Sequence, residues 1–373
     1  MRRTKLGMLI LSFILLVGGC AEQKLLEKIG LITLVGYDLD EDGKVVTTAV
    51  IRQVDPEFQS MVTTSTAVND SSLGALTEIN RKTTKKLVQG QMRITLFGET
   101  LATEGIRPFL NTLSKNSTTS SGILLAMTEG NSYELLEYPY ENINDVGQEI
   151  YKLIEQNVDA ELVVSTTLHE VVRDYYSVGR DIVLPIIERK DEVIEVSGLA
   201  LFNKDKIVGQ LPAKDSFYLL LIRGKFKSGK FETSIPGDIF SSNVFNSSES
   251  VPVVLDTITS TNKLKLTDQT IPEYELQINL KGRILELDAE VDFDNPKDVV
   301  KLEKAINESL KKELQSLFEY GQEINSDIFG LGEQYRSEVR KSKLTHESWH
   351  AMYPTAKVDI KVNFKILRSG VFE

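Results

Sequence analysis

The sequence is poor in residues that build metal centres and crosslinks: its 373 positions include one cysteine and three histidines. A single cysteine excludes an internal disulfide framework, a four-thiol zinc site and an iron–sulfur cluster. Three histidines leave little room for a histidine-rich metal centre. Basic residues are also scarce, because 43 Lys and Arg face 54 Asp and Glu and give a formal net charge of −11. This balance disfavours binding to nucleic-acid backbones, and adhesion to anionic lipid by charge alone.

The first twenty residues have the pattern of a bacterial lipoprotein signal. Three basic residues within the first five precede an apolar run from Leu6 to Val17. The run is too short to span the roughly 30 Å hydrocarbon core, but it has the length of a signal-peptide h-region. Val17-Gly18-Gly19-Cys20 then resembles a lipobox, and Cys20 is the only cysteine. We therefore expect 1–19 to be a cleaved signal peptide and Cys20 to be the lipid-attachment residue; the alternative is an uncleaved anchor with a chance cysteine.

The region 20–190 alternates strand-like and helix-like patterns, which predicts an α/β-type region of one or two subdomains. Asp42-Gly43 between two β-rich runs predicts a hairpin, because such turns need positive φ. Residues 55–70 are polar and are expected to be irregular. Helices are expected at 71–87 and 99–113, with a buried strand at 123–128.

Four consecutive charges at 189–192 mark a predicted domain boundary, so 191–373 is expected to be a second, α+β domain. It should contain a strand-rich stretch at 229–289 with a bulge or bend at Gly282. Two long helices should follow, the first beginning at Asn295-Pro296 and the second at Ser326-Asp327, and then a final strand. The fold class predicted is α+β, with mixed β-sheets flanked by helices in two to three domains.

Several of these segments resemble the Ger(x)C family, the lipoprotein C subunits of spore germinant receptors. The most specific motif is Asp327-Ile328-Phe329-Gly330-Leu331-Gly332, followed by Trp349 and Tyr353-Pro354. Ser197–Phe202 and Gly36-Tyr37-Asp38 add support. We interpret the large aromatic residues as core and the family glycines as backbone positions that need close packing or positive φ, rather than as ligand contacts.

The resemblance implies a non-enzymatic subunit that needs no cofactor and acts through protein contacts. Its expected partners are two integral-membrane receptor subunits, and its expected place is the extracytoplasmic face of the inner spore membrane, held there by acyl chains such as palmitate on Cys20. Whether the subunit binds the nutrient directly is left open, and the sequence names neither the nutrient nor the oligomeric state.

Two alternatives remain. His346-Glu347-Ser348-Trp349-His350 spells H-E-x-x-H, which on a helix could hold zinc for a metalloprotease. Against it, only Asp359, Glu373 and distant acids remain as a third ligand, and Pro354 limits the helix. The second alternative is a solute-binding lipoprotein of a transporter, which predicts two similar α/β lobes around a cleft.

Overall fold

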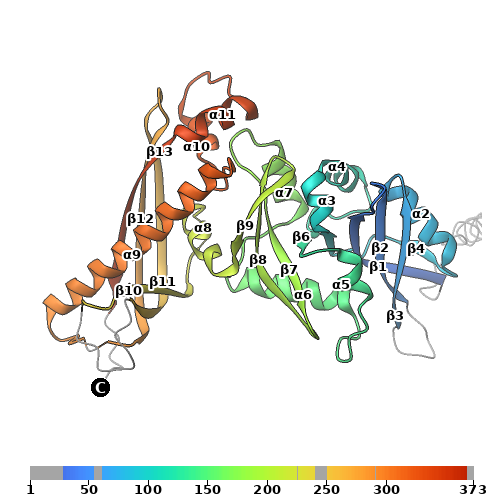
Figure 1. Cartoon of the computed structure of the whole chain (residues 1–373), viewed down its shortest axis with the longest axis horizontal. Coiled ribbons are helices and arrows are strands. Elements are labelled where there is room, and N and C mark those ends of the chain that lie inside the picture. Colours follow the sequence, from blue (N-terminus) through green and yellow to red (C-terminus); the bar gives the residue numbers. More distant parts are fainter. Residues whose placement is uncertain (1–27, 54–60, 225, 240–249, 290, 368–373) are drawn as a thin grey trace, which may run out of the picture.

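The computed structural model describes residues 28–53, 61–224, 226–239, 250–289 and 291–367. Cys20 and most of the predicted polar loop at 241–250 lie outside these ranges. The described chain forms two mixed sheets with helices packed against them (Figure 1), so the predicted α+β class is confirmed.

The larger sheet has nine strands, eight of them in the order β3-β2-β1-β5-β6-β7-β8-β9, with β4 paired to β1 beside β5. Its central strands run parallel and its outer strands antiparallel. The strands are β1 (Ile29–Leu39), β2 (Val45–Gln53), β3 (Met61–Asn69), β4 (Lys86–Val88), β5 (Ile94–Phe97), β6 (Leu124–Thr128), β7 (Val183–Lys190), β8 (Val193–Asn203) and β9 (Lys206–Pro212).

Helices cover both faces of this sheet, which explains why β5 and β6 are apolar and buried at every position. One face packs against α2 (Ser72–Lys82), α3 (Glu99–Glu104), α4 (Arg107–Lys115) and α7 (Leu168–Tyr176). The other packs against α5 (Ser132–Glu137) and α6 (Val146–Asp159).

Three local predictions in this region need correction. The segment expected to be irregular contains β3, a Thr- and Val-rich edge strand that exposes much of its surface. The helix expected to reach residue 87 ends at Lys82 and is followed by β4. The helix expected over 99–113 is divided at Gly105, whose φ of 125° ends α3 before α4 begins.

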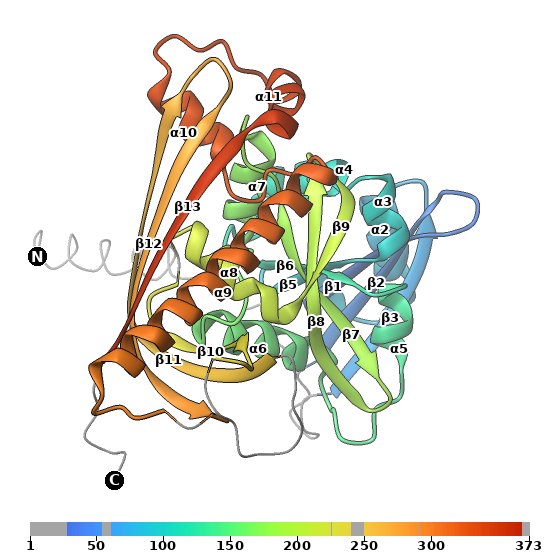
Figure 2. The same cartoon turned by 60° about the vertical axis from the view of Figure 1, so that its left-hand side comes forward.

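The smaller sheet has the order β10-β11-β12-β13, formed by β10 (Gly229–Pro236), β11 (Ser250–Asp268), β12 (Glu273–Leu287) and β13 (Lys357–Ile366). The 28-residue helix α9 (Pro296–Glu323) packs across it (Figure 2). Asn295 caps α9 as predicted, because its side chain accepts a hydrogen bond from the Lys297 amide at 3.1 Å. The predicted irregularity at Gly282 is also found: the β11–β12 register shifts between Thr257, its partner, and Thr259.

The two sheets share a core. One apolar cluster takes in residues of β7, β8 and β9 together with α8 (Ser216–Ile222), α9 and all four strands of the smaller sheet. The division predicted after residue 190 falls in the turn between β7 and β8, which pair from Val183↔Leu201 to Lys190↔Val193. Backbone hydrogen bonds between β7 and β8 therefore join the segments on either side of residue 190. The division into two domains stays a prediction from the sequence. Nor do the described sheets form the two similar lobes expected of a solute-binding protein.

Candidate functional site

The two halves of the chain meet at what we call the junction: residues 177–181, which link α7 to β7, against residues 326–333 and helix α11 (His346–Met352). Backbone contacts pair the two segments. The Asp181 amide donates to the Asp327 carbonyl at 2.9 Å, and the Glu333 amide donates to the Gly179 carbonyl at 3.1 Å. Gly179 and Gly332 pass so closely that a Cβ on Gly332 would lie 2.5 Å from the Gly179 Cα. Both positions therefore require glycine.

Asp327 is the buried polar centre of the family motif. Its carboxylate accepts hydrogen bonds from the Gly330, Leu331 and Gly332 amides at 2.8 to 3.1 Å, and from Trp349 Nε1 at 2.9 Å. Burial raises its pKa to about 6, although these amides act in the opposite direction. The loop that brings the amides to one carboxylate needs the left-handed backbone of Gly330, whose φ is 81°. Consequently α10 (Leu331–Glu338) begins after Gly330 and not at Ser326-Asp327 as predicted.

A second buried carboxylate, Asp181, faces the two histidines of the H-E-x-x-H segment. Oδ2 lies 2.7 Å from His350 Nε2, and Oδ1 lies 3.3 Å from His346 Nε2. The same oxygens accept the Asp327 amide at 2.8 Å and the Lys204 amide at 3.0 Å. His350 Nδ1 lies 2.9 Å from the His346 carbonyl, so this nitrogen donates and a protonated ring bonds through both nitrogens.

Burial and hydrogen bonding act against each other on this pair. Burial lowers the pKa of His350, but the hydrogen bond and negative charge of Asp181 outweigh it, so the pKa lies above the usual value. Burial raises the pKa of Asp181, but hydrogen bonds from His346 and His350 outweigh it, and the net pKa is well below the usual value. Asp181 and His350 therefore form a buried ion pair between the segment that precedes β7 and helix α11.

This geometry bears on the alternative that the H-E-x-x-H segment binds zinc. Asp181, His346 and His350 offer three donor atoms within 4.8 Å of one another, so the expectation that no third ligand is close was wrong. However, zinc bonds of about 2.0–2.2 Å at a tetrahedral angle place two donors about 3.4 Å apart. The 2.7 Å between His350 and Asp181 is a hydrogen-bond distance. Glu347, the general base of that alternative, is exposed. The arrangement fits a hydrogen-bonded ion pair better than a zinc site.

The ion pair predicts a pH dependence of stability. Because the folded-state pKa of His350 is raised, its proton stabilises the fold at low pH, and this stabilisation is lost as the pH rises through that pKa. We expect the melting temperature of the wild-type protein to fall between pH 6.5 and 8.5. His350→Gln, which cannot titrate, should melt lower at pH 6.5 and show a flatter profile by circular dichroism. Parallel profiles for the two proteins would contradict the assignment.

The other residues singled out in the sequence have structural positions. Trp349 and Tyr353 are 0% exposed, which confirms that they are core residues. The four family glycines also match the expectation. Gly36, Gly98 and Gly198 are closely packed against neighbouring atoms, and Gly330 has a positive φ. Asp181 was missed, because it follows a short Ser-Val-Gly-Arg stretch with no periodic pattern. The paired glycine at residue 179 was the one available signal.

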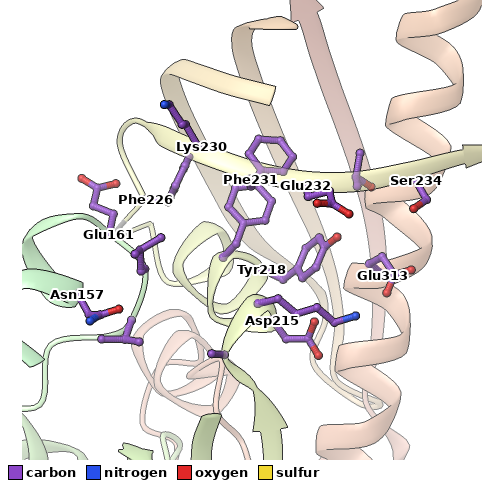
Figure 3. Close-up of a pocket in the computed structure, with 16 residues that line it drawn as sticks. Asn157, Glu161, Asp215, Tyr218, Phe226, Lys230, Phe231, Glu232, Ser234 and Glu313 are labelled. Carbon is purple, nitrogen blue, oxygen red and sulfur yellow. The ribbon is translucent and has the colours of Figure 1, made fainter. Parts of the chain in front are cut away.

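Two cavities lie beside the junction, on either side of Glu161 and Val163. The first has a volume of about 470 Å³ and an aromatic wall in which Phe217 stacks on Phe231 at 3.8 Å between ring centroids. Figure 3 shows Phe231 of β10 and Tyr218 of α8 in the middle of the view, with Glu313 of α9 on the right and Asn157 and Glu161 on the left. The second cavity has a volume of about 430 Å³ and is lined largely by charged side chains.

Comparison with known proteins identifies the family. Residues 22–189 match the family described as spore germination protein N-terminal domain, and residues 197–370 match the one described as spore germination B3/GerAC like, C-terminal. The chain belongs to the Ger(x)C family. Members of the Ger(x)C family are the C subunits of spore germinant receptors, and the resemblance seen in the sequence is confirmed.

Relatives of this Ger(x)C protein cover most of its length. It is 28% identical over 366 residues to spore germination protein GerQC of Bacillus cereus, covering 98% of each chain. It is 19% identical over 328 residues to the putative spore germination protein YfkR of Bacillus subtilis (strain 168), covering 82% of this chain and 79% of YfkR. The crystal structure of the GerBC protein has the same fold, with a TM-score of 0.54 at 14% identity, over 90% of this chain and 97% of GerBC.

Proposed function

We propose that this Ger(x)C protein is a lipid-anchored, non-catalytic subunit of a nutrient germinant receptor. Acyl chains on Cys20 hold it on the extracytoplasmic face of the inner spore membrane, where it contacts two integral-membrane subunits. The observation that carries the proposal is the family match, which spans 22–189 and 197–370 and begins two residues after the lipobox cysteine. Among the described residues, no helix is both long and apolar enough to cross a membrane.

The chemistry of the junction supports a structural role. The carboxylates of Asp181 and Asp327 are bonded to backbone amides, histidine and tryptophan, and the bonds of Asp181 to the Asp327 amide and to His350 join segments far apart in the sequence. A carboxylate whose oxygens are taken up by internal hydrogen bonds holds chain segments together, whereas a catalytic carboxylate must be within reach of a substrate. We infer that the junction fixes the surfaces that the membrane subunits contact.

Tethering gives the protein a physical advantage in assembly. A chain confined beside its partners has a high effective concentration, so modest interfaces suffice for binding. One acyl chain anchors only marginally, whereas two or more give stable attachment. The lipid on Cys20 would thus allow binding to the membrane subunits without a large protein–protein interface.

Cys20→Ala should therefore abolish the nutrient response of spores that depend on this receptor. The variant should also leave the membrane fraction, because the acylation site is gone. Nutrient-triggered loss of spore refractility and immunoblotting of spore membranes measure the two effects. Gln23→Ala, three residues after Cys20, is the matched control and should behave as the wild type. Normal assembly and response in Cys20→Ala spores would refute the tethering role.

Co-purification tests the partners directly. The full-length protein, extracted from spore membranes in detergent, should bring with it two polytopic membrane proteins at comparable abundance by mass spectrometry. Recovery of transporter components in their place would favour the solute-binding alternative.

A further inference from the structure

The second cavity gathers positive charge in a protein whose net charge is negative. Four basic residues line it: Arg173, Arg180, Arg223 and Lys227. They come from both halves of the chain, since Arg173 and Arg180 precede β7 while Arg223 and Lys227 follow α8. With 54 acidic residues against 43 basic ones in the whole chain, such a group needs a specific explanation.

Arg223 is hydrogen-bonded to carbonyl groups, and its one ion pair, with Asp174, is long. Its side chain is 9% exposed, Nε donates to the Ile328 carbonyl at 2.7 Å, and Nη2 donates to the Asp181 carbonyl at 3.3 Å. Nη1 lies 3.8 Å from Asp174 Oδ2, beyond hydrogen-bond distance. Burial, with the charges of Arg180 and Arg173 adding to it, lowers the pKa of Arg223 to about 10 even though Asp174 acts in the opposite direction. Asp174 is thus shared between two guanidinium groups, since its Oδ1 binds Arg173 and its Oδ2 faces Arg223.

Arg180 has an unsatisfied donor. Its Nε is buried and has no hydrogen-bond partner among the described residues, which is costly for a charged group. The guanidinium packs over Gly330, where a Cβ would come within 2.5 Å of Nε. The junction therefore fixes Arg180 in position without neutralising it.

The carboxylates that line the cavity are already engaged. Arg173 binds Asp174 through two nitrogens, at 2.9 and 2.7 Å. Glu161 accepts the Lys227 and Ser228 amides. Glu170 accepts the Ser165 hydroxyl at 2.6 Å and completes the N-terminal capping box of α7. In the described part of the chain, none of these three carboxylates forms an ion pair with Arg180.

We propose that this cavity is a binding site for a small oxyanion, a phosphate or carboxylate group carried on an organic residue. Guanidinium groups present paired N–H donors that match the oxygens of both groups. The volume of about 430 Å³ exceeds that of a bare anion, and Val163, Val164 and Leu220 provide apolar surface for an attached group. Because Arg180 comes from the first half of the chain and Arg223 from the second, the bound anion ties the two halves together.

The test uses the full-length protein in detergent, with phenyl phosphate and inorganic phosphate as probes and sodium chloride at matched ionic strength as the control. Phenyl phosphate should raise the melting temperature in a saturable manner, with inorganic phosphate weaker. Arg180→Gln should weaken binding by about tenfold or more in calorimetry. Without ligand this variant should melt at or above the wild-type temperature, because it removes an unpaired buried donor. Arg81→Gln, on the exposed surface of α2, should bind as the wild type does.

Two further outcomes are decisive. If phenyl phosphate produces no saturable effect, or stabilises Arg180→Gln as strongly as Arg81→Gln, the proposal is overturned. Short-chain phosphatidylglycerol separates the sources of the oxyanion. If it binds in an Arg180-dependent manner and more tightly than phenyl phosphate, the ligand is a lipid headgroup; weaker binding assigns a soluble ligand.

Discussion

Gly332→Ala is expected to destabilise the protein by about 3 kcal/mol, because the added methyl group has no space at the junction. Its Cβ would lie 2.5 Å from the Gly179 Cα and 2.6 Å from Nε1 and Cε2 of Trp349. Neither neighbour is the flexible end of a side chain: one is backbone, and the other is a fully buried ring that binds Asp327. Relief therefore requires the two segments to separate, which also loses the Glu333 amide bond to the Gly179 carbonyl. Urea denaturation followed by tryptophan fluorescence measures the loss, since Trp349 is the only tryptophan.

Gly90→Ala is the matched control for this substitution. A Cβ at residue 90 meets nothing within 4 Å, so the same chemical change should alter stability by no more than about 0.5 kcal/mol. If Gly332→Ala were as mild as Gly90→Ala, the close packing at the junction would not be rigid, and the explanation of the Gly-Leu-Gly motif given above would fail.

Asp181→Ala should cost about 3–5 kcal/mol, since it leaves a buried histidine without its counter-charge. The Asp327 and Lys204 amides lose their acceptor in the same step. Part of the loss is recovered if His350 gives up its proton, so the pKa of His350 should fall in this variant. NMR titration of the histidine ring protons, together with urea denaturation, measures both effects.

A double-mutant cycle separates the ion pair from the other bonds of Asp181. Asp181→Ala combined with His350→Ala should cost clearly less than the sum of the single substitutions, because the second change removes the stranded charge. His169→Ala, on the exposed surface of α7, should leave stability unchanged and controls for the loss of a histidine. Strictly additive costs would show that Asp181 and His350 do not interact.

The elements that follow from local chemistry could be predicted. Asn295 caps α9 because an asparagine before a proline is suited to that position, and Asp42-Gly43 forms the turn of the first hairpin. The failures share a cause, which is contact with distant residues. Ser326-Asp327 resembles a helix start, yet Asp327 binds amides three to five residues further on as well as Trp349. β3 is polar in sequence and becomes a strand by pairing with β2.

Only part of the candidate site could be predicted from the sequence. The motif at 327–332 and Trp349 were found by resemblance, but their partners Gly179 and Asp181 lie about 150 residues upstream. Nothing in the local pattern says which buried carboxylate meets which histidine, because that depends on how the two sheets share their core. The arginine cavity is hidden for the same reason, because three strands (β7, β8 and β9) and α8 separate Arg180 from Arg223 in the sequence.

The pairing of β7 with β8 has a consequence for the two family units as separate molecules. A chain cut at residue 190 would leave β7 as an open sheet edge whose first five residues are buried in the intact protein. The cut would also expose apolar residues of the core that the two sheets share, such as Leu199 and Leu201. Open edges and bare apolar surface both promote self-association. We therefore expect proteolysis between the two family units to yield fragments that aggregate instead of two soluble halves.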